Sequence, residues 1–174
     1  GQGGYQIERV LPAAELATDR SRWGSEDVER LTRMLEDPDS AVRAWAAIGL
    51  RTRGEEAVRS AAAALRAALD DPSPPVRIQA AEALGRFGED TDLAPAVGLL
   101  LASASITEND FFDALLALNA LDYLPPDVLG GADTQGWRDR VSGLPSELEG
   151  LDRRFRNYVP RLLEAIWLDL DRAP

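Results

Sequence analysis

The sequence contains no cysteine, no histidine and no lysine. It therefore lacks the thiolate nucleophile, the side chain that most often transfers protons near neutral pH, and the two commonest zinc ligands. An absence of cysteine fits every redox compartment and identifies none of them. All 19 basic residues are arginines, so any cationic surface of this protein must be built from arginine alone.

Long apolar runs are also absent. No segment approaches the roughly 18 uninterrupted apolar residues that a membrane span requires, and we expect no membrane interaction. The first residues, Gly1 to Tyr5, lack the basic start and apolar run of a signal peptide, which leads us to expect a mature fragment or an excised domain. With 174 residues, 45% of them apolar, the chain is long enough to fold as one domain with a buried core.

Positive charge is scarce relative to negative charge. The formal net charge is −11 at pH 7, which disfavours nucleic acid as a partner because phosphate binding depends on concentrated cationic side chains. Residues 91–136 contain acidic residues and no arginine at all. This segment is interpreted either as a solvated face that aids solubility or as a docking surface for a basic partner.

One phrase occurs twice in the chain. Residues 37–54 read DPDSAVRAWAAIGLRTRG and residues 71–88 read DPSPPVRIQAAEALGRFG, so that Asp37 corresponds to Asp71 and Gly54 to Gly88. Equivalent residues are 34 positions apart (71 − 37 = 34), and this spacing is called the repeat period below. A fixed period of this length predicts a solenoid of helical hairpins, each of which must stack on its neighbours to cover its apolar face.

Local signals indicate two helices in each hairpin. Between residues 55 and 69 apolar side chains recur at steps of three and four, as on an amphipathic helix. The Asp-Pro pair at Asp71 ends this helix, and Ser73 is expected to cap the next one. Gly54 and Gly88 are expected to end the second helices in the left-handed conformation. The alanine pairs of the second helices allow neighbouring layers to approach closely.

These signals predict an all-α fold, a short right-handed α–α superhelix of about three helical hairpins with capping helices at both ends. We expect the remaining segments to fold around the two clear repeats, with Pro12 starting or kinking a turn and Pro160 dividing the last element. The expected divisions are an N-terminal cap (1–24), three repeats (25–54, 55–88 and 89–124), an irregular loop (125–145) and a C-terminal cap helix (146–174).

The repeated phrase, an Asp-Pro turn followed by Val-Arg and an alanine-rich helix ending in Leu and Gly, resembles the HEAT-like repeat. The ordered phrases YQIERVLPAAELA, DPDSAVRAWAAIGL, PPVRIQAAEALG, ALNALDYL and YVPRLLEAIWLDL resemble, more narrowly, the C-terminal HEAT-repeat segment of bacterial sulfatases of the arylsulfatase and N-sulfoglucosamine sulfohydrolase type. This resemblance covers most of the chain apart from residues 125–145. It implies the non-catalytic tail of a hydrolase that is often exported to the periplasm or the exterior. That family's Cys-x-Pro-Ser-Arg motif, its formylglycine and its calcium ion would belong to the parent catalytic domain.

Two aspartates and two arginines are candidates for a structural ladder. Asp37 precedes Arg43 by six residues, and Asp71 precedes Arg77 by the same distance. In HEAT-like units such residues commonly pair between adjacent layers, so the resemblance implies a ladder beside the inner helices. Arginine suits this role because its planar fork can hold a carboxylate and backbone carbonyls together. We expect Arg77→Ala to destabilise the fold, and the alternative is a ligand-binding arginine.

Three aromatic residues are candidates for contact with a partner. Trp45, whose repeat-equivalent is a glutamine, either packs on the N-terminal segment around Trp23 or marks a partner contact, since aromatic residues are favoured interface anchors. Phe111 and Phe112 cannot both point inward on one helix, and we expect Phe112 in the core and Phe111 partly exposed. Trp137 either packs onto the stacked helices or is exposed as an anchor for a partner.

No sequence motif indicates a reaction. Calcium loops, nucleophile elbows, P-loops and dinucleotide fingerprints are missing, and the string GEDTD at 88–92 is better explained by helix capping through Thr91 or Asp92. We therefore expect no catalytic, cofactor-binding or metal-binding residues.

The sequence favours a non-catalytic protein-interaction domain, whose partner is its own sulfatase catalytic domain or a second copy of the chain. One alternative is a freestanding scaffold for an unrelated protein. A less favoured alternative is an enzyme on the same fold. A DNA glycosylase would need a cationic groove, and a chromophore lyase would need an apolar cleft.

Overall fold

The computed structural model describes residues 7–105, 108–130 and 158–166, and every regular element within these ranges is an α-helix. The all-α prediction is therefore confirmed. The helices are α1 (Ile7–Thr18), α2 (Ser25–Met34), α3 (Ser40–Arg53), α4 (Glu55–Ser60), α5 (Ala62–Ala68), α6 (Pro74–Phe87), α7 (Asp90–Ser103), α8 (Phe111–Asp122), α9 (Pro126–Gly130) and a further helix over 158–166.

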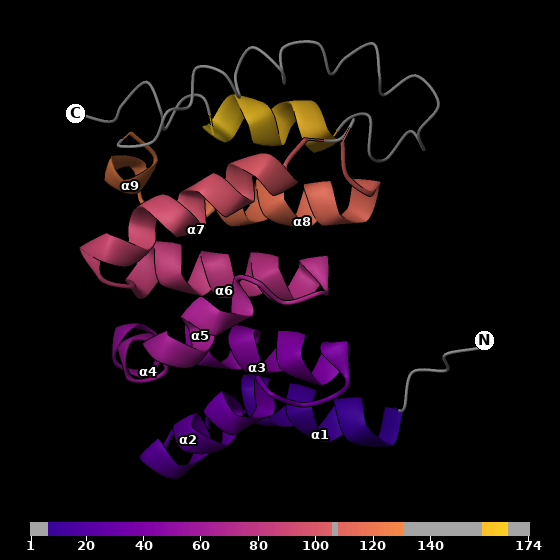
Figure 1. Ribbon diagram of the computed structural model, residues 1–174, viewed down its shortest axis with the longest axis vertical. Helices are drawn as coiled ribbons and strands as arrows, with labels where there is room; N and C mark the ends of the chain where they lie inside the picture. The colour runs from indigo at the N-terminus through magenta and orange to yellow at the C-terminus, as the bar shows by residue number, and fades with distance from the viewer. Residues whose placement is uncertain (1–6, 106–107, 131–157, 167–174) are drawn as a thin grey trace.

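The helices form two rows that are stacked along the long axis of the molecule (Figure 1). The inner row consists of α1, α3, α6 and α8, each of which packs on the next. The outer row consists of α2, α4 with α5, and α7, and lies in front of the inner row in this view. The two repeated phrases therefore lie side by side as α3 and α6, which is the stacking that the repeat period predicts.

Small side chains allow this close stacking. Ala46 on α3 and its repeat-equivalent Ala80 on α6 are both fully buried. At Gly49 an added Cβ would lie 2.9 Å from Cδ2 of Leu31 and 3.0 Å from Cα of Ala17, so a larger residue would push α3 away from α1 and α2. The result is one continuous apolar core that runs from α1 to helix 158–166; its largest fully buried side chains are Leu16, Leu31, Leu50, Leu65, Ile78, Leu84, Leu100, Leu118, Leu121 and Ile166.

The Asp-Pro turns use their aspartates to hold the start of the next helix. Asp39 is the N-cap of α3 and accepts a hydrogen bond from the backbone N–H of Ala41 at 2.9 Å. Ser73 occupies the N-cap position of α6, as predicted, but its side chain makes no capping bond. Its backbone N–H donates to Oδ1 of Asp71 at 2.8 Å, as the backbone N–H of Asp39 donates to Oδ1 of Asp37 at 2.8 Å, so in both turns the Asp-Pro aspartate fixes the residue that precedes the helix.

The two glycines that follow the inner helices serve different purposes. Gly54 has φ = 86° and ψ = −160°, so its φ is positive as predicted, although the ψ is that of an extended conformation open essentially to glycine alone and not that of a left-handed helix. Gly88 has φ = −71°, so the prediction of a left-handed terminator is wrong at this position. Glycine is required at Gly88 for space, because an added Cβ would lie 2.5 Å from the carbonyl oxygen of Leu84 and 2.9 Å from Cβ of Asp92.

The outer helix of the second repeat is broken. The apolar pattern predicts one helix over 55–69, but the structure has α4 and α5 on either side of Ala61, whose φ and ψ are −97° and 7°. The hydroxyl of Ser60 donates to the carbonyl oxygen of Ala57 at 3.0 Å. Side-chain bonds of this kind compete with the helical ladder and bend helices, a local effect that apolar periodicity does not report.

The structure describes all or part of three further segments that contain proline. Pro12 does not start a turn, because α1 continues through it. Residues 125–145 were expected to be irregular, yet α9 forms at their beginning, and 131–145 lie outside the described residues. Pro160 lies within helix 158–166. The rest of the predicted last element, 146–157 and 167–174, lies outside the described residues, so its division at Pro160 stays a prediction.

Candidate functional site

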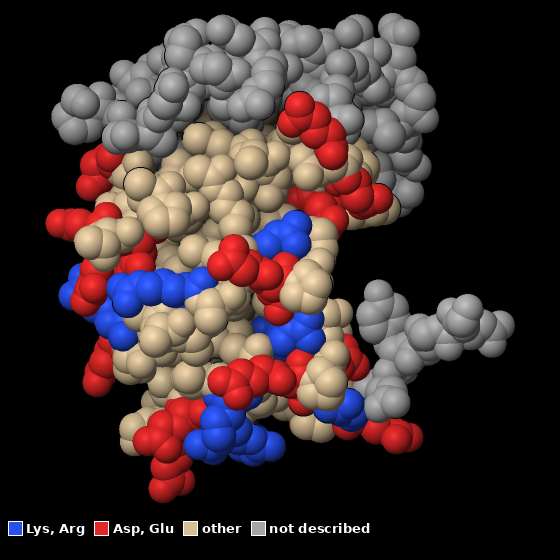
Figure 2. Space-filling model, viewed as in Figure 1, with Lys and Arg blue, Asp and Glu red and all other residues tan. Residues whose placement is uncertain are grey.

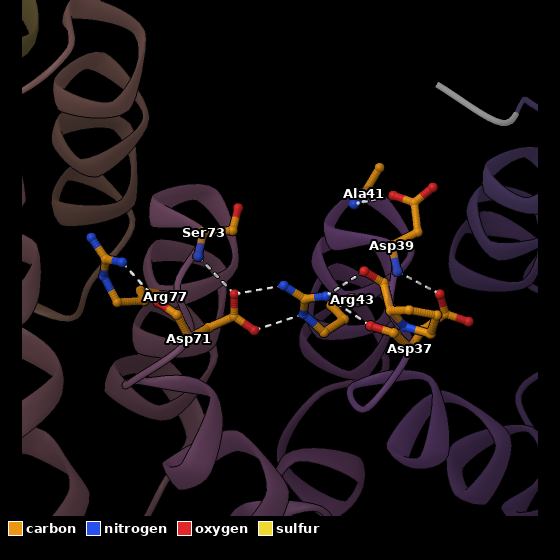
Figure 3. A network of polar contacts seen from close by, with 8 residues as sticks. Asp37, Asp39, Ala41, Arg43, Asp71, Ser73 and Arg77 are labelled. Carbon is orange, nitrogen blue, oxygen red and sulfur yellow. Dashed lines mark hydrogen bonds and ion pairs between the residues drawn. The ribbon is translucent and has the colours of Figure 1, made fainter. Parts of the chain in front are cut away.

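The predicted ladder residues meet along one edge of the inner row, at the turns that precede its helices (Figure 3). Nε and Nη2 of Arg43 donate to Oδ2 and Oδ1 of Asp71 at 2.7 and 2.9 Å, a bidentate pair between one layer and the next. Nη1 of the same arginine donates to the carbonyl oxygen of Asp37 at 2.7 Å. One guanidinium therefore binds the turn of its own layer and the carboxylate of the following layer, which its planar fork permits.

The ladder begins one layer earlier than the sequence indicated. Nη2 of Arg9 donates to both carboxylate oxygens of Asp37, at 2.8 and 2.9 Å. Arg9, Arg43 and Arg77 follow one another at the repeat period, so stepping back one period from Arg43 would have identified Arg9. Sequence comparison missed it because the remainder of the N-terminal segment matches the repeat weakly.

The ladder loses its carboxylate at the last arginine. Nη1 of Arg77 donates to the carbonyl oxygen of Asp71 at 2.7 Å, which repeats the bond of Arg43 to its own turn. The residue one repeat period after Asp71 is Ser105, and within the described residues no carboxylate forms an ion pair with Arg77. The arginine six residues after each turn aspartate thus binds the backbone carbonyl oxygen of that aspartate. Of the three ladder arginines, Arg9 and Arg43 each also bind a carboxylate of the next layer, Arg43 through two of its nitrogens.

Charge and burial shape the protonation of this pair. Only 12% of the Arg43 side chain and 8% of the Asp71 side chain are exposed. Burial acts to raise the pKa of Asp71, but the hydrogen bonds from Arg43 and Ser73 and the charges of Arg43 and Arg77 outweigh it and lower the pKa. The hydrogen bond to Asp71 raises the pKa of Arg43. Both groups are therefore held in their charged forms.

A second polar cluster lies between α3 and α6. Arg51 forms an ion pair with Glu82 and donates to Oε1 of Gln79 at 2.9 Å, while Nη1 of Arg86 donates to Oε1 of Glu82 at 3.4 Å. Glu82 and Gln79 are buried. The pKa of Arg51 is lowered to about 10, first by burial and then by the charge of Arg86, which leaves it protonated at neutral pH. The cluster therefore consists of compensated charges that join two layers.

A third cluster joins the outer row to the α6–α7 turn. Nε of Arg66 donates to Oδ1 of Asp92 at 2.5 Å, and Nη2 donates to Glu89 at 3.1 Å. Asp92 also accepts the backbone N–H of Glu89 at 3.0 Å, within a capping box at the start of α7. The hydrogen bond from Arg66 lowers the pKa of Asp92. Of the two capping candidates in this segment, the capping role thus involves Asp92, together with Glu89.

A stripe of exposed and partly exposed positions on α1 and α3, here called the inner face, carries apolar side chains. On α3 it consists of Ala41, Ala44, Trp45, Ile48 and Thr52. On α1 the positions one repeat period earlier include Ile7 and Leu11, which are 70% and 54% exposed. On α6 the residues equivalent to Ala44, Trp45 and Ile48 are buried, and two of them belong to the polar cluster described above.

Trp45 borders a hollow between α3 and α6 of about 230 Å³, with Ile48 on the same helix and Ser73 and Pro75 opposite. Trp23 lies elsewhere, against the guanidinium groups of Arg20 and Arg53, whose Cζ atoms are 5.8 and 5.9 Å from the ring centroid. It lines a separate cavity of about 290 Å³ beside α2 and α4. The two tryptophans thus border separate cavities, and a partner contact at Trp45 stays a prediction.

The two adjacent phenylalanines adopt the reverse of the expected arrangement. Phe111 packs against the core, whereas Phe112 is 67% exposed. Phe112 is the second residue after the N-cap Asp110, as Ala41 is after Asp39, and that position faces outward on each inner helix. Phe111 is thus not the exposed member of the pair. Trp137 lies outside the described residues.

Acidic residues lie at the starts of the inner helices α3 and α8. Within the described residues, Asp39, Asp110 and Asp113 form no ion pair. Burial and then the charge of Asp110 raise the pKa of Asp113, against an opposing effect of Arg77. The outer row is different: Figure 2 shows arginines and acidic residues together over its lower part and an uncharged surface over α7. The arginine-free segment is therefore not uniformly acidic on its surface.

Two classes of site find no support in the described part of the chain. No group of three or more acidic side chains in these ranges could hold a metal ion. None of the described helices combines the length and the apolar character that crossing a bilayer demands.

Comparison with known proteins identifies the repeats. A family model of HEAT repeats matches residues 28–115, from α2 into α8. No curated protein matches the chain significantly.

Proposed function

This chain belongs to the HEAT-repeat family, and we propose that it is a non-catalytic domain that binds another protein through its inner face. HEAT repeats are generally protein-interaction scaffolds, in which stacked hairpins present an extended surface. The finer parts of this proposal, the surface used and the setting of the domain, rest on the geometry of the inner row and on the order of the sequence phrases.

The observation that carries the proposal is that large apolar side chains of the inner face are exposed or partly exposed. Ile7 and Leu11 on α1 are more than half exposed, and Trp45 and Ile48 border a hollow on α3. Core formation does not explain these residues, because the neighbouring positions of the same helices already form the continuous core. A row of exposed apolar residues is typical of a surface that a partner covers.

The enzymatic alternatives receive less support. A DNA glycosylase would need a cationic groove, but the ladder arginines Arg9 and Arg43 are already paired with aspartates and the acids of the inner face are uncompensated. A chromophore lyase would need a large apolar cleft, and the hollow at Trp45 is smaller than the roughly 300–1,000 Å³ of common ligand pockets. No described residue is assigned a catalytic role.

The setting that we propose is the C-terminal part of a bacterial sulfatase, with the catalytic domain on the N-terminal side as the natural partner. Its support is the ordered set of five phrases that resemble such segments. Any calcium ion or formylglycine would then belong to that catalytic domain, and the compartment would be the periplasm or the exterior. The full reading frame tests this setting. An upstream Cys-x-Pro-Ser-Arg motif is expected, and a frame without one favours the freestanding scaffold instead.

Site-specific photo-crosslinking tests the proposed surface. A crosslinking amino acid placed at Trp45 on the inner face, or at the exposed Arg59 on α4, is activated in native cells. We expect a defined protein adduct from position 45 and none of the same size from position 59. The identified protein is then purified, and its affinity for the chain and for Trp45→Gln is measured by calorimetry. Adducts that form equally from both positions, or an unchanged affinity, would contradict an inner-face interaction.

A further inference from the structure

We propose that the partner segment on the inner face is basic and amphipathic, with an apolar side chain in the hollow beside Trp45 and with lysine or arginine side chains facing Asp39 and Asp110. This inference rests on the proposed function, because it names the chemistry of the partner for the same surface.

The hollow defines the apolar part of the partner. Its walls are Ala41, Ala44, Trp45 and Ile48 from α3 and Pro75 from α6, with the hydroxyl-bearing Ser40 and Ser73 at the helix starts. No charged side chain lines it. A cavity of about 230 Å³ with such walls accepts an aliphatic or aromatic side chain and desolvates it, which is how interface anchors gain affinity. A purely polar segment would leave the apolar walls of the hollow in contact with water.

The helix starts on either side define the charge of the partner. Asp39 directly precedes the hollow as the N-cap of α3, and Asp110 is the N-cap of α8, on the far side of α6. Each carboxylate accepts one backbone N–H through Oδ1, at 2.9 Å, so its second oxygen is available to a donor from outside. Figure 3 shows the carboxylate of Asp39 directed away from Arg43 and the ladder.

Within the described residues, the nearby arginines form no ion pair with these carboxylates. Arg43 is committed to Asp71 and to the carbonyl oxygen of Asp37, and Arg9 is committed to Asp37. Arg77 uses Nη1 for its own turn and opposes, without abolishing, the upward shift in the pKa of Asp113. The described part of the inner face therefore keeps an excess of negative charge beside its apolar hollow, and a cationic segment complements both features.

A second copy of the chain is a poorer occupant. The formal net charge is −11, and a symmetric contact through the inner face would bring the same aspartates of two copies together. Like charges brought together at an interface repel each other and lower the affinity, which disfavours such a dimer. An acidic partner is disfavoured for the same reason.

Binding of designed peptides to the full chain tests the inference. Two fluorescent amphipathic peptides of about 18 residues, or five helical turns, share one leucine face and carry either lysine or glutamate on the other. Fluorescence anisotropy measures their affinities for the wild type, for Asp39→Asn/Asp110→Asn, for Trp45→Gln and for a control, Glu29→Gln/Glu56→Gln. Asparagine caps helices as well as aspartate does, so the first variant loses charge without losing its caps. The control loses the same charge from the exposed outer row.

We expect the lysine peptide to bind and the glutamate peptide not to bind. Asp39→Asn/Asp110→Asn, called the N-cap variant, should bind the lysine peptide about two- to fivefold more weakly for each charge removed. Trp45→Gln should bind it about tenfold more weakly, or less tightly still. Addition of salt should weaken wild-type binding more than that of the N-cap variant. Equal binding of the two peptides would overturn the inference, as would equal losses in the N-cap variant and the outer-row control, which would indicate attraction to net charge alone.

Affinity measurements on the natural partner distinguish a failure of this inference from a failure of the proposed function. If the protein crosslinked at position 45 loses affinity with Trp45→Gln but not with Asp39→Asn/Asp110→Asn, the inner face is an interaction surface and the basic chemistry is wrong. If Trp45→Gln has no effect on that partner, the proposed function itself fails.

Discussion

Arg43 and Asp71 lie 28 residues apart in the chain and form a bidentate ion pair that joins two layers of the stack, with N–O distances of 2.7 and 2.9 Å. The same arginine closes the turn of its own layer through the carbonyl oxygen of Asp37. Each of these layers is thus positioned by a residue of the layer before it, in addition to the apolar contacts between the inner helices.

Removal of this arginine should destabilise the fold strongly. We expect Arg43→Ala to lower the free energy of unfolding by about 2–4 kcal/mol, because it leaves the carboxylate of Asp71 buried without its partner. Arg77→Ala should cost less, about 1 kcal/mol, since only one carbonyl bond is lost. Arg59→Ala, which removes an exposed pair within α4, should cost under about 0.5 kcal/mol. Urea denaturation measures all three, and an order in which Arg43→Ala is the mildest would refute the role of the ladder.

Stability should fall in acid partly through Asp71. Its pKa in the folded protein is lowered from 3.8, so the stabilisation is fully present above pH 3.8 and is lost as the pH falls through the lower folded value. The free energy of unfolding should therefore decrease below about pH 4, and the decrease should be shallower in Asp71→Asn. Urea titrations at several pH values test this, and parallel curves for the two proteins would show that Asp71 does not contribute.

Two glycines in helices should respond oppositely to alanine. Gly49→Ala should destabilise the protein by about 1–3 kcal/mol, because its Cβ would lie 2.9 Å from Leu31 and 3.0 Å from the backbone of Ala17. Gly98→Ala on α7 meets nothing within 4 Å and should stabilise by about 0.5–1 kcal/mol through helix propensity. Thermal unfolding of the pair provides the measurement. A stabilising Gly49→Ala would mean that α1 and α3 are not closely packed.

The buried carboxylate of Glu82 should be necessary for the cluster between α3 and α6. Glu82→Gln leaves Arg51 and Arg86 without their carboxylate, and we expect a loss of about 3 kcal/mol. The control Glu89→Gln, whose side chain is 63% exposed beside Arg66, should lose under about 1 kcal/mol. Adding Arg51→Met to Glu82→Gln should recover part of the loss, because the uncompensated cation is removed. Chemical denaturation that finds the two single variants equal would contradict this account.

Some predictions failed because a local pattern does not reveal which face of a helix is covered. Phe112 belongs to an apolar stretch, yet it is 67% exposed at the start of α8, whereas the adjacent Phe111 packs against the core. Gly88 has the composition of a left-handed terminator, but its φ is negative and the close approach of Leu84 and Asp92 requires it instead. The break at Ala61 follows a side-chain bond of Ser60 that periodicity does not record.

The sequence by itself determined the helical hairpins, the period between layers, and the small residues and Asp-Pro turns that let layers stack, because these depend on local conformational preference and on a spacing shared by neighbours. Tertiary structure alone decided which arginine holds which aspartate, that Arg77 has no carboxylate partner among the described residues, and which apolar side chains are left for a partner. Those outcomes depend on distances between residues about 28 positions apart, which are established only when one layer has packed on the next.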